Sequence, residues 1–490
     1  MSRKRSIVCI DQFIEATRDS GYKGTAHAVS ELVDNSIQAG AGRVTIAIED
    51  PRGQANEILV LDDGRGMDAD ELWQALQFGG SSRFDDRSGL GRYGMGLPNA
   101  SLSQARRVEV FSWRDRGSCL KAVLDVDLIQ TEGRTHLSSP DPSCLEELPF
   151  LGELPPHGTL VRLMRADRLD AKRSRTIARR LEVHLGRVYR HSLWDGVEIV
   201  VNGSPVVPID PLFLSNESRT TGATVADNWT QEFRVPGSGD GETAVVSVRF
   251  SKLPVGEWAH LPTEEKRALG ISNGAGVSVV RAGREIDYGW FFLRGRRRQN
   301  YDDWWRCEVC FEPALDELFG ITHTKQQVRP SSELLEYLSP PMIETAARLH
   351  AEVRAEYARN STRSKSESME VVAAQRDLDW SQILSGGSKS NRSVSYRIDE
   401  AATVGDFMLF DAEVTDDELV ARINPQHAFY QQIYKPLTKA TRPSPAGEGL
   451  KALLLAMARA EILVSKGGGE AEMRDFRRHL SHALGEFLRK

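Results

Sequence analysis

The stretch E-L-V-D-N-S at residues 31–36 decides how the N-terminal part of this chain is interpreted. It lies within residues 25–39, whose apolar and polar residues alternate as in an amphipathic helix. Positions four residues apart share one face of a helix, so Glu31 and Asn35 are expected on the same side. A carboxylate able to act as a general base would then lie one turn from an amide oxygen able to bind Mg²⁺.

A second element, L-D-D-G-R-G-M at residues 61–67, follows an apolar, β-prone run that begins at Ile58. This run predicts a strand that ends at Asp62. A carboxylate at a strand end can accept a hydrogen bond from an exocyclic amino group such as that of adenine. Gly64 and Gly66 would let the backbone approach a flat base closely.

The third element is a glycine-rich segment that ends in G-R-Y-G-M-G-L at residues 91–97. Such a segment suits a loop that folds over phosphates and offers them backbone N–H groups. The following L-P-N-A-S-L-S-Q-A predicts a helix whose N-terminus faces the anion. One glycine-rich loop alone is more often an ordinary loop, but the three elements in this order indicate an ATP site.

These elements resemble those of the GHKL ATPase superfamily, which contains gyrase, the heat-shock chaperone, histidine kinases and the MutL mismatch-repair proteins. The likeness is greatest to MORC-type ATPases and their prokaryotic relatives. It rests on the E-x-x-x-N, D-x-G-x-G and G-x-x-G-x-G elements and on His157-Gly158-Thr159, where the superfamily keeps a late strand threonine. The resemblance covers roughly residues 1–345 and implies an α+β chain with a Bergerat-type α/β sandwich nucleotide domain, followed by an α/β transducer domain.

The resemblance also implies roles for individual residues. Glu31 would polarise the water that attacks the γ-phosphate, and Lys325, in F-G-I-T-H-T-K-Q-Q at 319–327, would reach back to that phosphate. Asn35 would hold Mg²⁺, and Asp62 would bind the adenine amino group. The other expected nucleotide contacts are Gly64, Gly66, Met67, Gly91, Tyr93, Gly94, Met95, Gly96, Leu97 and Thr159. For Asp34 and Asp63, an ordinary role as solvated or capping carboxylates remains equally open.

The composition along the chain predicts four blocks: a nucleotide domain at 1–167, a transducer-like domain at 168–345, a helix and Ser-rich linker at 346–397, and a helical C-terminal domain at 398–490. Strands are expected at 197–201, 244–250, 277–281 and 307–311, with a hairpin turn at Ala282-Gly283. The Ser-rich tracts at 361–368 and 385–393 are interpreted as linkers. The apolar run at 448–464 predicts a buried helix.

The remaining features bear on the class of protein. The chain has 490 residues, 40% of them hydrophobic, and contains no long apolar run or N-terminal signal, so a cytoplasmic location without a membrane is expected. The five cysteines, including Cys307 and Cys310, are expected as reduced thiols, those of this pair buried. A histidine kinase would need a domain with a phosphoacceptor histidine before its ATP-binding domain. That class is disfavoured, because none of the residues before the helix at 25–39 is a histidine.

Charge is the clue to a partner. The net charge is −6, yet basic residues cluster at Lys172–Arg190 and Arg294–Arg298. Binding to a phosphate backbone needs only local patches, although a solvated helix face and a basic loop are equally open interpretations. With the resemblance, the expected function is an ATP- and Mg²⁺-dependent homodimeric clamp that binds or remodels double-stranded DNA, in prokaryotic defence with partner proteins. The alternative is a chaperone-like clamp that acts on protein clients.

Overall fold

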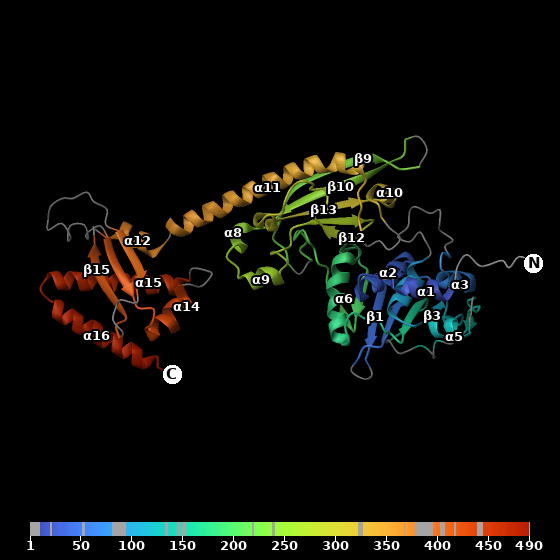
Figure 1. The fold of residues 1–490 in the computed structure, drawn as a ribbon, viewed down its shortest axis with the longest axis horizontal. Coiled ribbons are helices and arrows are strands. Elements are labelled where there is room, and N and C mark those ends of the chain that lie inside the picture. Colours follow the sequence, from blue (N-terminus) through green and yellow to red (C-terminus); the bar gives the residue numbers. More distant parts are fainter. Residues whose placement is uncertain are drawn as a thin grey trace, which may run out of the picture. The chain divides into compact units, whose positions relative to one another are not determined.

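The computed structural model describes residues 10–19, 22–50, 54–80, 95–132, 136–143, 145, 148, 153–217, 220–237, 241–321, 327–366, 368–377, 395–401, 407–415, 418–438 and 444–489 (Figure 1). The chain divides into two compact units. The first comprises Met1–Pro254 and Gly270–His350, and the second comprises Val255–Leu269 and Ala351–Lys490. Among the described residues, none of the helices combines the length and apolarity needed to cross a membrane.

The first unit begins with an eight-stranded sheet in the order β5-β4-β3-β6-β2-β1-β7-β8. Its strands are β1 (Arg43–Glu49), β2 (Glu57–Asp62), β3 (Arg107–Trp113), β4 (Leu120–Asp125), β5 (Asp141–Pro142), β6 (Gly158–Met164), β7 (Glu198–Val201) and β8 (Ser204–Pro205). The associated helices are α1 (Ile10–Asp19), α2 (Thr25–Gln38), α3 (Ala69–Leu76), α4 (Gly96–Gln104), α5 (Val126–Glu132), α6 (Ser174–Val188) and α7 (Arg190–Trp194).

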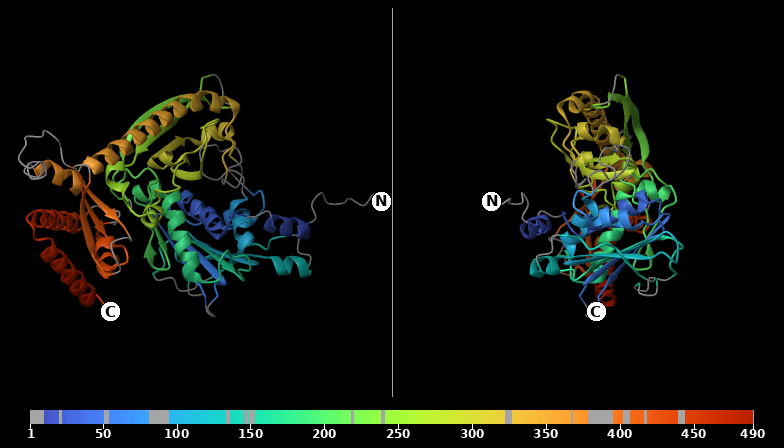
Figure 2. Two further views of the ribbon diagram at one scale, coloured as in Figure 1. Left: turned by 60° about the vertical axis from the view of Figure 1, so that its left-hand side comes forward. Right: turned by 90° about the vertical axis from the view of Figure 1, so that its right-hand side faces the viewer.

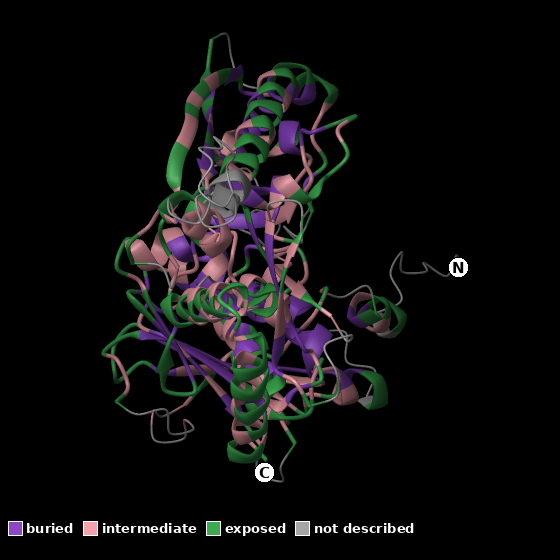
Figure 3. Ribbon diagram, turned by 90° about the vertical axis from the view of Figure 1, so that its left-hand side faces the viewer, coloured by how far each residue is buried: buried purple, intermediate pink, exposed green. Residues whose placement is uncertain are grey.

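Strand β2 shows how this sheet is built, because its apolar residues alternate between two cores. Ile58 and Val60 pack with residues of α1, α2, α4 and α6, so these helices cover one face of the sheet (Figure 2). Leu59 and Leu61 point to the other face and pack in a smaller cluster with Phe111 and Trp113. Both faces are therefore covered, which explains why the strand is a continuous run of apolar, buried residues. Figure 3 colours the buried segments of the chain purple and the exposed ones green.

The second sheet of this unit has five strands in the order β12-β11-β13-β10-β9. Its strands are β9 (Thr224–Arg234), β10 (Thr243–Lys252), β11 (Val277–Arg281), β12 (Arg284–Gly289) and β13 (Trp305–Phe311). They share a core with α10 (Asp316–Phe319) and with the first part of α11 (Ser332–Ser366). The predicted strands at 244–250, 277–281 and 307–311 and the hairpin at Ala282-Gly283 are confirmed. The strand predicted at 197–201 also forms, as β7, but it pairs with β1. The eight-stranded sheet therefore extends beyond residue 167, the predicted end of the nucleotide domain.

The second unit contains α8 (Val255–Trp258), α9 (Thr263–Ala268), α12 (Met369–Arg376), β14 (Ser395–Glu400), β15 (Phe410–Thr415), β16 (Glu418–Ile423), α14 (Lys435–Thr438), α15 (Pro445–Lys466) and α16 (Glu470–Phe487). Helix α15 confirms the helix predicted at 448–464. The expectation of a helical C-terminal domain at 398–490 is wrong in part, because β14, β16 and β15 form a three-stranded sheet beside its helices. Each of these strands has only six residues, too few for the alternation of apolar residues to stand out among the charged ones.

One predicted linker is also helical. Helix α11 continues to Ser366, through most of the tract predicted as a linker at 361–368. That tract contains neither Gly nor Pro, the two residues that most disfavour a helix, and its Arg and Lys residues favour the helical state. The second tract, 385–393, lies outside the described residues.

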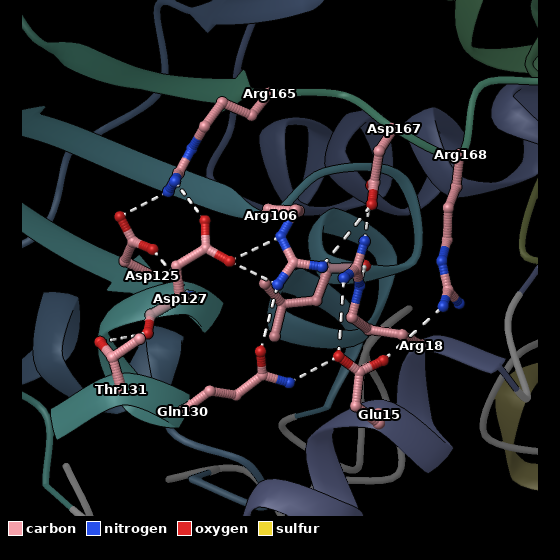
Figure 4. Close-up of polar contacts among 11 residues, drawn as sticks. Glu15, Arg18, Arg106, Asp125, Asp127, Gln130, Thr131, Arg165, Asp167 and Arg168 are labelled. Carbon is pink, nitrogen blue, oxygen red and sulfur yellow. Dashed lines mark hydrogen bonds and ion pairs between the residues drawn. The ribbon is translucent and has the colours of Figure 1, made fainter. Parts of the chain in front are cut away.

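Polar contacts attach α1 to the nucleotide sheet and its helices (Figure 4). The buried Arg18 donates from Nε to the Leu102 carbonyl at 2.9 Å, and its Nη2 lies 2.6 Å from Asp167 Oδ1. Gln130 Nε2 donates to Glu15 Oε1 at 2.7 Å, and Arg168 pairs with Asp19 at 2.8 Å. Leu102 lies in α4, the helix that follows the glycine-rich segment. The Arg18 hydrogen bond therefore attaches α1 to α4.

Candidate nucleotide site

Helix α2 carries the first predicted motif as expected. Glu31 is buried, with 3% of its surface exposed, and Asn35 lies one turn later and is half-buried. An ideal Cβ placed on Gly96 would lie 3.3 Å from Glu31 Oε2, so the backbone at the end of the glycine-rich loop reaches the carboxylate. Motifs about 65 residues apart in sequence are therefore adjacent in space.

The same helix fixes the second motif through Ser36. Ser36 Oγ donates to Asp62 Oδ2 at 2.8 Å, and the backbone N–H groups of Gly64 and Thr159 donate to Asp62 Oδ1 at 3.0 and 3.2 Å. Burial raises the pKa of Asp62, while these three hydrogen bonds act in the opposite direction. The carboxylate is thus held in one orientation at the end of β2. It retains lone pairs for a further donor.

The loop after Asp62 packs against the ends of β3 and β6. Gly66 has a φ of +69°, and a Cβ there would lie 2.1 Å from the Trp113 carbonyl oxygen, so a side chain cannot be accommodated. Met67 N–H donates to Ser112 Oγ at 2.8 Å. Thr159 is the register partner of Asp62, and its Oγ1 lies 2.9 Å from Ser112 Oγ. The predicted threonine is therefore beside the predicted carboxylate.

Helix α4 begins where the glycine-rich segment ends. Met95 occupies its N-cap position and makes no side-chain cap, and the N–H groups of Gly96 and Leu97 lie in the first turn. Pro98 has no N–H, and the buried Asn99 Oδ1 has no hydrogen-bond partner in the described part of the chain. A helix N-terminus with uncapped N–H groups next to Gly96 and Glu31 suits a phosphate group.

Comparison with known proteins agrees with this geometry. Residues 22–153 match the family described as histidine kinase-, DNA gyrase B- and HSP90-like ATPase. They carry a GHKL ATPase domain. Similar proteins include the DNA mismatch repair protein MutL of Halobacterium salinarum, 45% identical over 65 residues, which are 13% of this chain and 10% of MutL.

Two MORC proteins are also similar to part of this chain. Protein MICRORCHIDIA 6 of Arabidopsis thaliana is 33% identical over 105 residues, which are 21% of this chain and 16% of that protein. The human ATPase MORC2 is 37% identical over 98 residues, which are 19% of this chain and 9% of that protein. The matched residues thus make up between 9% and 16% of the length of these three relatives.

The residues of the GHKL domain fit a magnesium nucleotide. Asp62 offers an acceptor at the end of a strand, where a purine amino group can donate to it. The amide oxygen of Asn35 is the kind of hard ligand that Mg²⁺ prefers, and the nucleotide phosphates would supply others. Glu31 lies one turn from Asn35 on α2 and next to Gly96 in the first turn of α4, a suitable place for activating water.

Part of the predicted site lies outside the described residues. This applies to Gly91, Tyr93 and Gly94 of the glycine-rich loop and to Lys325. Met95, Gly96 and Leu97 are described, and Leu97 is buried in the helix-side core. The roles of the residues outside the described ranges remain predictions.

Several residues around the GHKL site had no role in the sequence interpretation. Ser36 holds Asp62, Ser112 holds the loop after it, and His157 Nδ1 lies 2.7 Å from the Gly64 carbonyl oxygen. Ser36 directly follows Asn35, and His157 precedes the predicted Gly-Thr pair, so their proximity to the motifs was a usable signal. Ser112 gave no such signal, because only the pairing of β3 with β6 brings it to Thr159.

The two aspartates left open above behave differently. Asp34 is fully buried and accepts hydrogen bonds from Tyr189 Oη at 2.6 Å and from Arg284 Nε at 2.7 Å. It is therefore neither solvated nor a cap. Asp63 accepts the backbone N–H of Arg43 at 2.8 Å, an ordinary local contact.

The basic cluster at Lys172–Arg190 is only partly a surface patch. Arg190 is buried and pairs with Glu285 and Glu308, and Arg187 pairs with Glu285 at 2.7 Å. The exposed cations lie on the first half of α6, where Arg175, Arg179 and Arg180, with Arg187, line an open groove of about 650 Å³. In the second cluster, Arg296 and Arg298 pair with Asp302 and Asp303. Sequence counts had not separated the buried cations from the exposed ones.

The cysteine pair is also explained. Cys307 and Cys310 are free thiols on β13, and burial raises the pKa of both. Potential ligand atoms of His191, Glu308 and Cys310 lie within 4.8 Å of one another. The Glu308 carboxylate, however, is already paired with the buried Arg190, and His191 lies 3.4 Å from it, so we interpret this cluster as part of an ion-pair network.

Replacing Asp62 with Asn tests the adenine assignment. The amide can still accept the two backbone N–H groups, but its NH₂ group then faces Ser36 and the purine amino group as a donor. We expect affinity for ADP to fall about 10- to 100-fold, as for a buried donor left without an acceptor. Isothermal titration calorimetry measures this. As the control, Ser36→Ala keeps the carboxylate and should lose only a few-fold (about 0.5–1.5 kcal/mol). Unchanged affinity in Asp62→Asn would contradict the assignment.

Proposed function

We propose that this protein is a cytoplasmic, ATP-hydrolysing clamp that dimerises when it binds ATP and acts on double-stranded DNA. The observation that carries the proposal is the convergence on α2 of Glu31, Asn35, the Ser36–Asp62 contact and the backbone of Gly96. This set supplies a base, a Mg²⁺ ligand, a purine acceptor and a phosphate-facing helix end. Mg²⁺ would neutralise phosphate charge and orient the γ-phosphate for attack.

In this proposal each motif has one role in the ATP cycle. Glu31 accepts a proton from the attacking water. Asn35 would hold Mg²⁺, which would supply positive charge next to the phosphates. Lys325, which follows α10 in the sequence, contacts the γ-phosphate. Because ADP has no γ-phosphate, this contact distinguishes ATP from ADP. Closure of the glycine-rich loop over ATP creates a surface for a second protomer, and hydrolysis releases it.

The proposal that DNA is the partner rests on the exposed face of α6. Arg175 and Arg179 are exposed, lie four residues apart on one face, and make no ion pair within the described part of the chain. Unpaired cations along a helix suit a phosphate backbone, independent of base sequence. The relatives named MutL carry DNA mismatch repair in their name, which favours the same class of partner. A role in prokaryotic defence with partner proteins rests only on the MORC-like resemblance.

The first test concerns the base. Glu31→Ala should bind ATP with near-normal affinity but hydrolyse it roughly 10²-fold more slowly or worse, within the usual range for a positioned base. Release of phosphate and binding of a non-hydrolysable ATP analogue measure the two properties separately.

Lys325→Ala serves as the comparison for this test. It should slow hydrolysis and leave ADP affinity unchanged, because the lysine contacts only the γ-phosphate. The role of Glu31 is refuted if Glu31→Ala loses binding and hydrolysis together.

The second test concerns the oligomeric state. With Mg²⁺ and a non-hydrolysable ATP analogue, the protein should shift from monomer toward dimer in light scattering, and ADP should not produce this shift. The physical reason is that only the γ-phosphate holds the loop closed. An identical mass in the apo, ADP and analogue states would contradict the clamp.

The third test concerns DNA. Affinity for double-stranded DNA should fall steeply between 50 and 200 mM salt and show little sequence preference, as phosphate contacts require. Arg175→Glu with Arg179→Glu should weaken binding to all sequences and reduce the salt slope by about one per lost contact. Fluorescence anisotropy measures both.

The matched control reverses two exposed arginines on a different helix. Arg474→Glu with Arg478→Glu, on α16, changes the net charge equally and should leave DNA affinity nearly unchanged. If the wild-type protein binds no DNA at low salt in any nucleotide state, the chaperone-like clamp on protein clients becomes the leading proposal.

A further inference from the structure

One side chain of the five-stranded sheet contacts helix α2, which carries Glu31 and Asp34. Arg284, the first residue of β12, is buried, with 7% of its side chain exposed. Its Nε donates to Asp34 Oδ1 at 2.7 Å, and its Nη2 lies 3.7 Å from Glu31 Oε1. The two hydrogen-bonded residues, Arg284 and Asp34, are 250 positions apart in sequence. A cation from the second sheet therefore faces the proposed general base.

The hairpin turn defines where this side chain points. Ala282 and Gly283 have φ values of 47° and 81°, so the two-residue turn between β11 and β12 is of the type that suits the twist of paired strands. The next residue after Arg284 is held from the opposite side. Glu285 accepts from Arg187 Nε at 2.7 Å and from Arg190 Nη1 at 3.0 Å. Opposite charges on adjacent residues thus fix the tip of the hairpin against both α2 and the α6–α7 segment.

Electrostatics require a cation at this place. Glu31 and Asp34 are both buried on the same helix, and buried carboxylates are costly unless they are paired. Tyr189 donates a hydrogen bond to Asp34 but brings no charge. Burial acts to lower the pKa of Arg284, but the charges of Asp34 and Glu31 outweigh it and raise that pKa, so the guanidinium stays protonated.

The same strand also contacts Val328, near the start of the described residues 327–366. Val328 N–H donates to Asp287 Oδ2 at 3.4 Å, and Asp287 lies three residues after Arg284 in β12. Two groups with a bearing on hydrolysis, Arg284 and the segment after Lys325, are therefore attached to one strand.

We propose that Arg284 is a positioning residue for ATP hydrolysis, which holds Asp34 and orients Glu31 and so makes turnover depend on the placement of the second sheet. This inference rests on the proposed function, because it needs Glu31 to act as the base. Arg284 acts through Glu31 and contacts no reacting atom. Its loss should therefore change the rate of the chemical step and leave nucleotide binding almost intact.

The experiment uses the full chain and compares three variants in steady-state ATPase assays. Arg284→Met keeps the apolar stem and removes the charge; we expect kcat to fall roughly 10-fold or more, with KM and the affinity for a non-hydrolysable ATP analogue within about twofold of wild type. Arg284→Lys restores the charge and should recover part of kcat. Thermal unfolding monitors the fold of each variant.

The matched control is Arg281→Met. Arg281 lies on the other side of the same turn and forms a bidentate pair with Asp316, at 2.6 and 2.7 Å. Its removal breaks a buried ion pair of the same hairpin away from Glu31 and Asp34. We expect it to lower thermal stability while kcat stays within about threefold of wild type.

Each outcome decides the inference. A kcat loss specific to Arg284→Met, with partial recovery in Arg284→Lys, supports it. Equal kcat losses in Arg281→Met and Arg284→Met would overturn it in favour of a purely structural hairpin, and so would weakened analogue binding with normal kcat. Should Arg284→Met fail to fold, Arg284→Lys and Arg284→Gln supply the same comparison. Normal kcat in every Arg284 variant refutes the inference alone, whereas a wild-type protein without ATPase activity refutes the proposed function itself.

Discussion

The burial of charge on α2 is the constraint on which the rest of the first unit depends. Glu31 and Asp34 are 3% and 0% exposed, and neither can be buried without compensation. Tyr189 and Arg284 supply it from two other elements. These contacts fix the rotation of α2 about its own axis and its position along that axis. They therefore also fix the direction in which Asn35 and Ser36 point.

Consecutive positions of this helix serve different neighbours. Asp34 faces the second sheet, Ser36 faces β2 through Asp62, and Glu31 meets the backbone of Gly96. A helix turns by about 100° per residue, so a short segment can contact several surrounding elements. A nucleotide bound here would contact groups whose positions all depend on the placement of one helix. The second sheet reaches the same helix, since Arg284 Nη2 lies 3.7 Å from Glu31 Oε1.

Charge counts in the sequence overstate the available basic surface. Residues 172–190 contain seven Lys and Arg residues. Two of these, however, form ion pairs: Arg187 with Glu285 and Arg190 with Glu308. A guanidinium that neutralises a buried carboxylate cannot also bind a phosphate backbone. What remains is the exposed first half of α6, a narrower and better defined surface. The same reasoning removes Arg296 and Arg298 from the second cluster.

The sequence by itself determined the local features of this protein: the helix at 25–38, the strand ending at Asp62, the hairpin at Ala282-Gly283 and the GHKL motifs. These follow from periodicities and glycine positions that act over a few residues. Only the tertiary structure decided that β7 joins the eight-stranded sheet, that β14, β15 and β16 form a sheet in the C-terminal block, and that Arg284 reaches Asp34. Such contacts join residues far apart in the chain, and they depend on how whole sheets and helices pack, which no short pattern records.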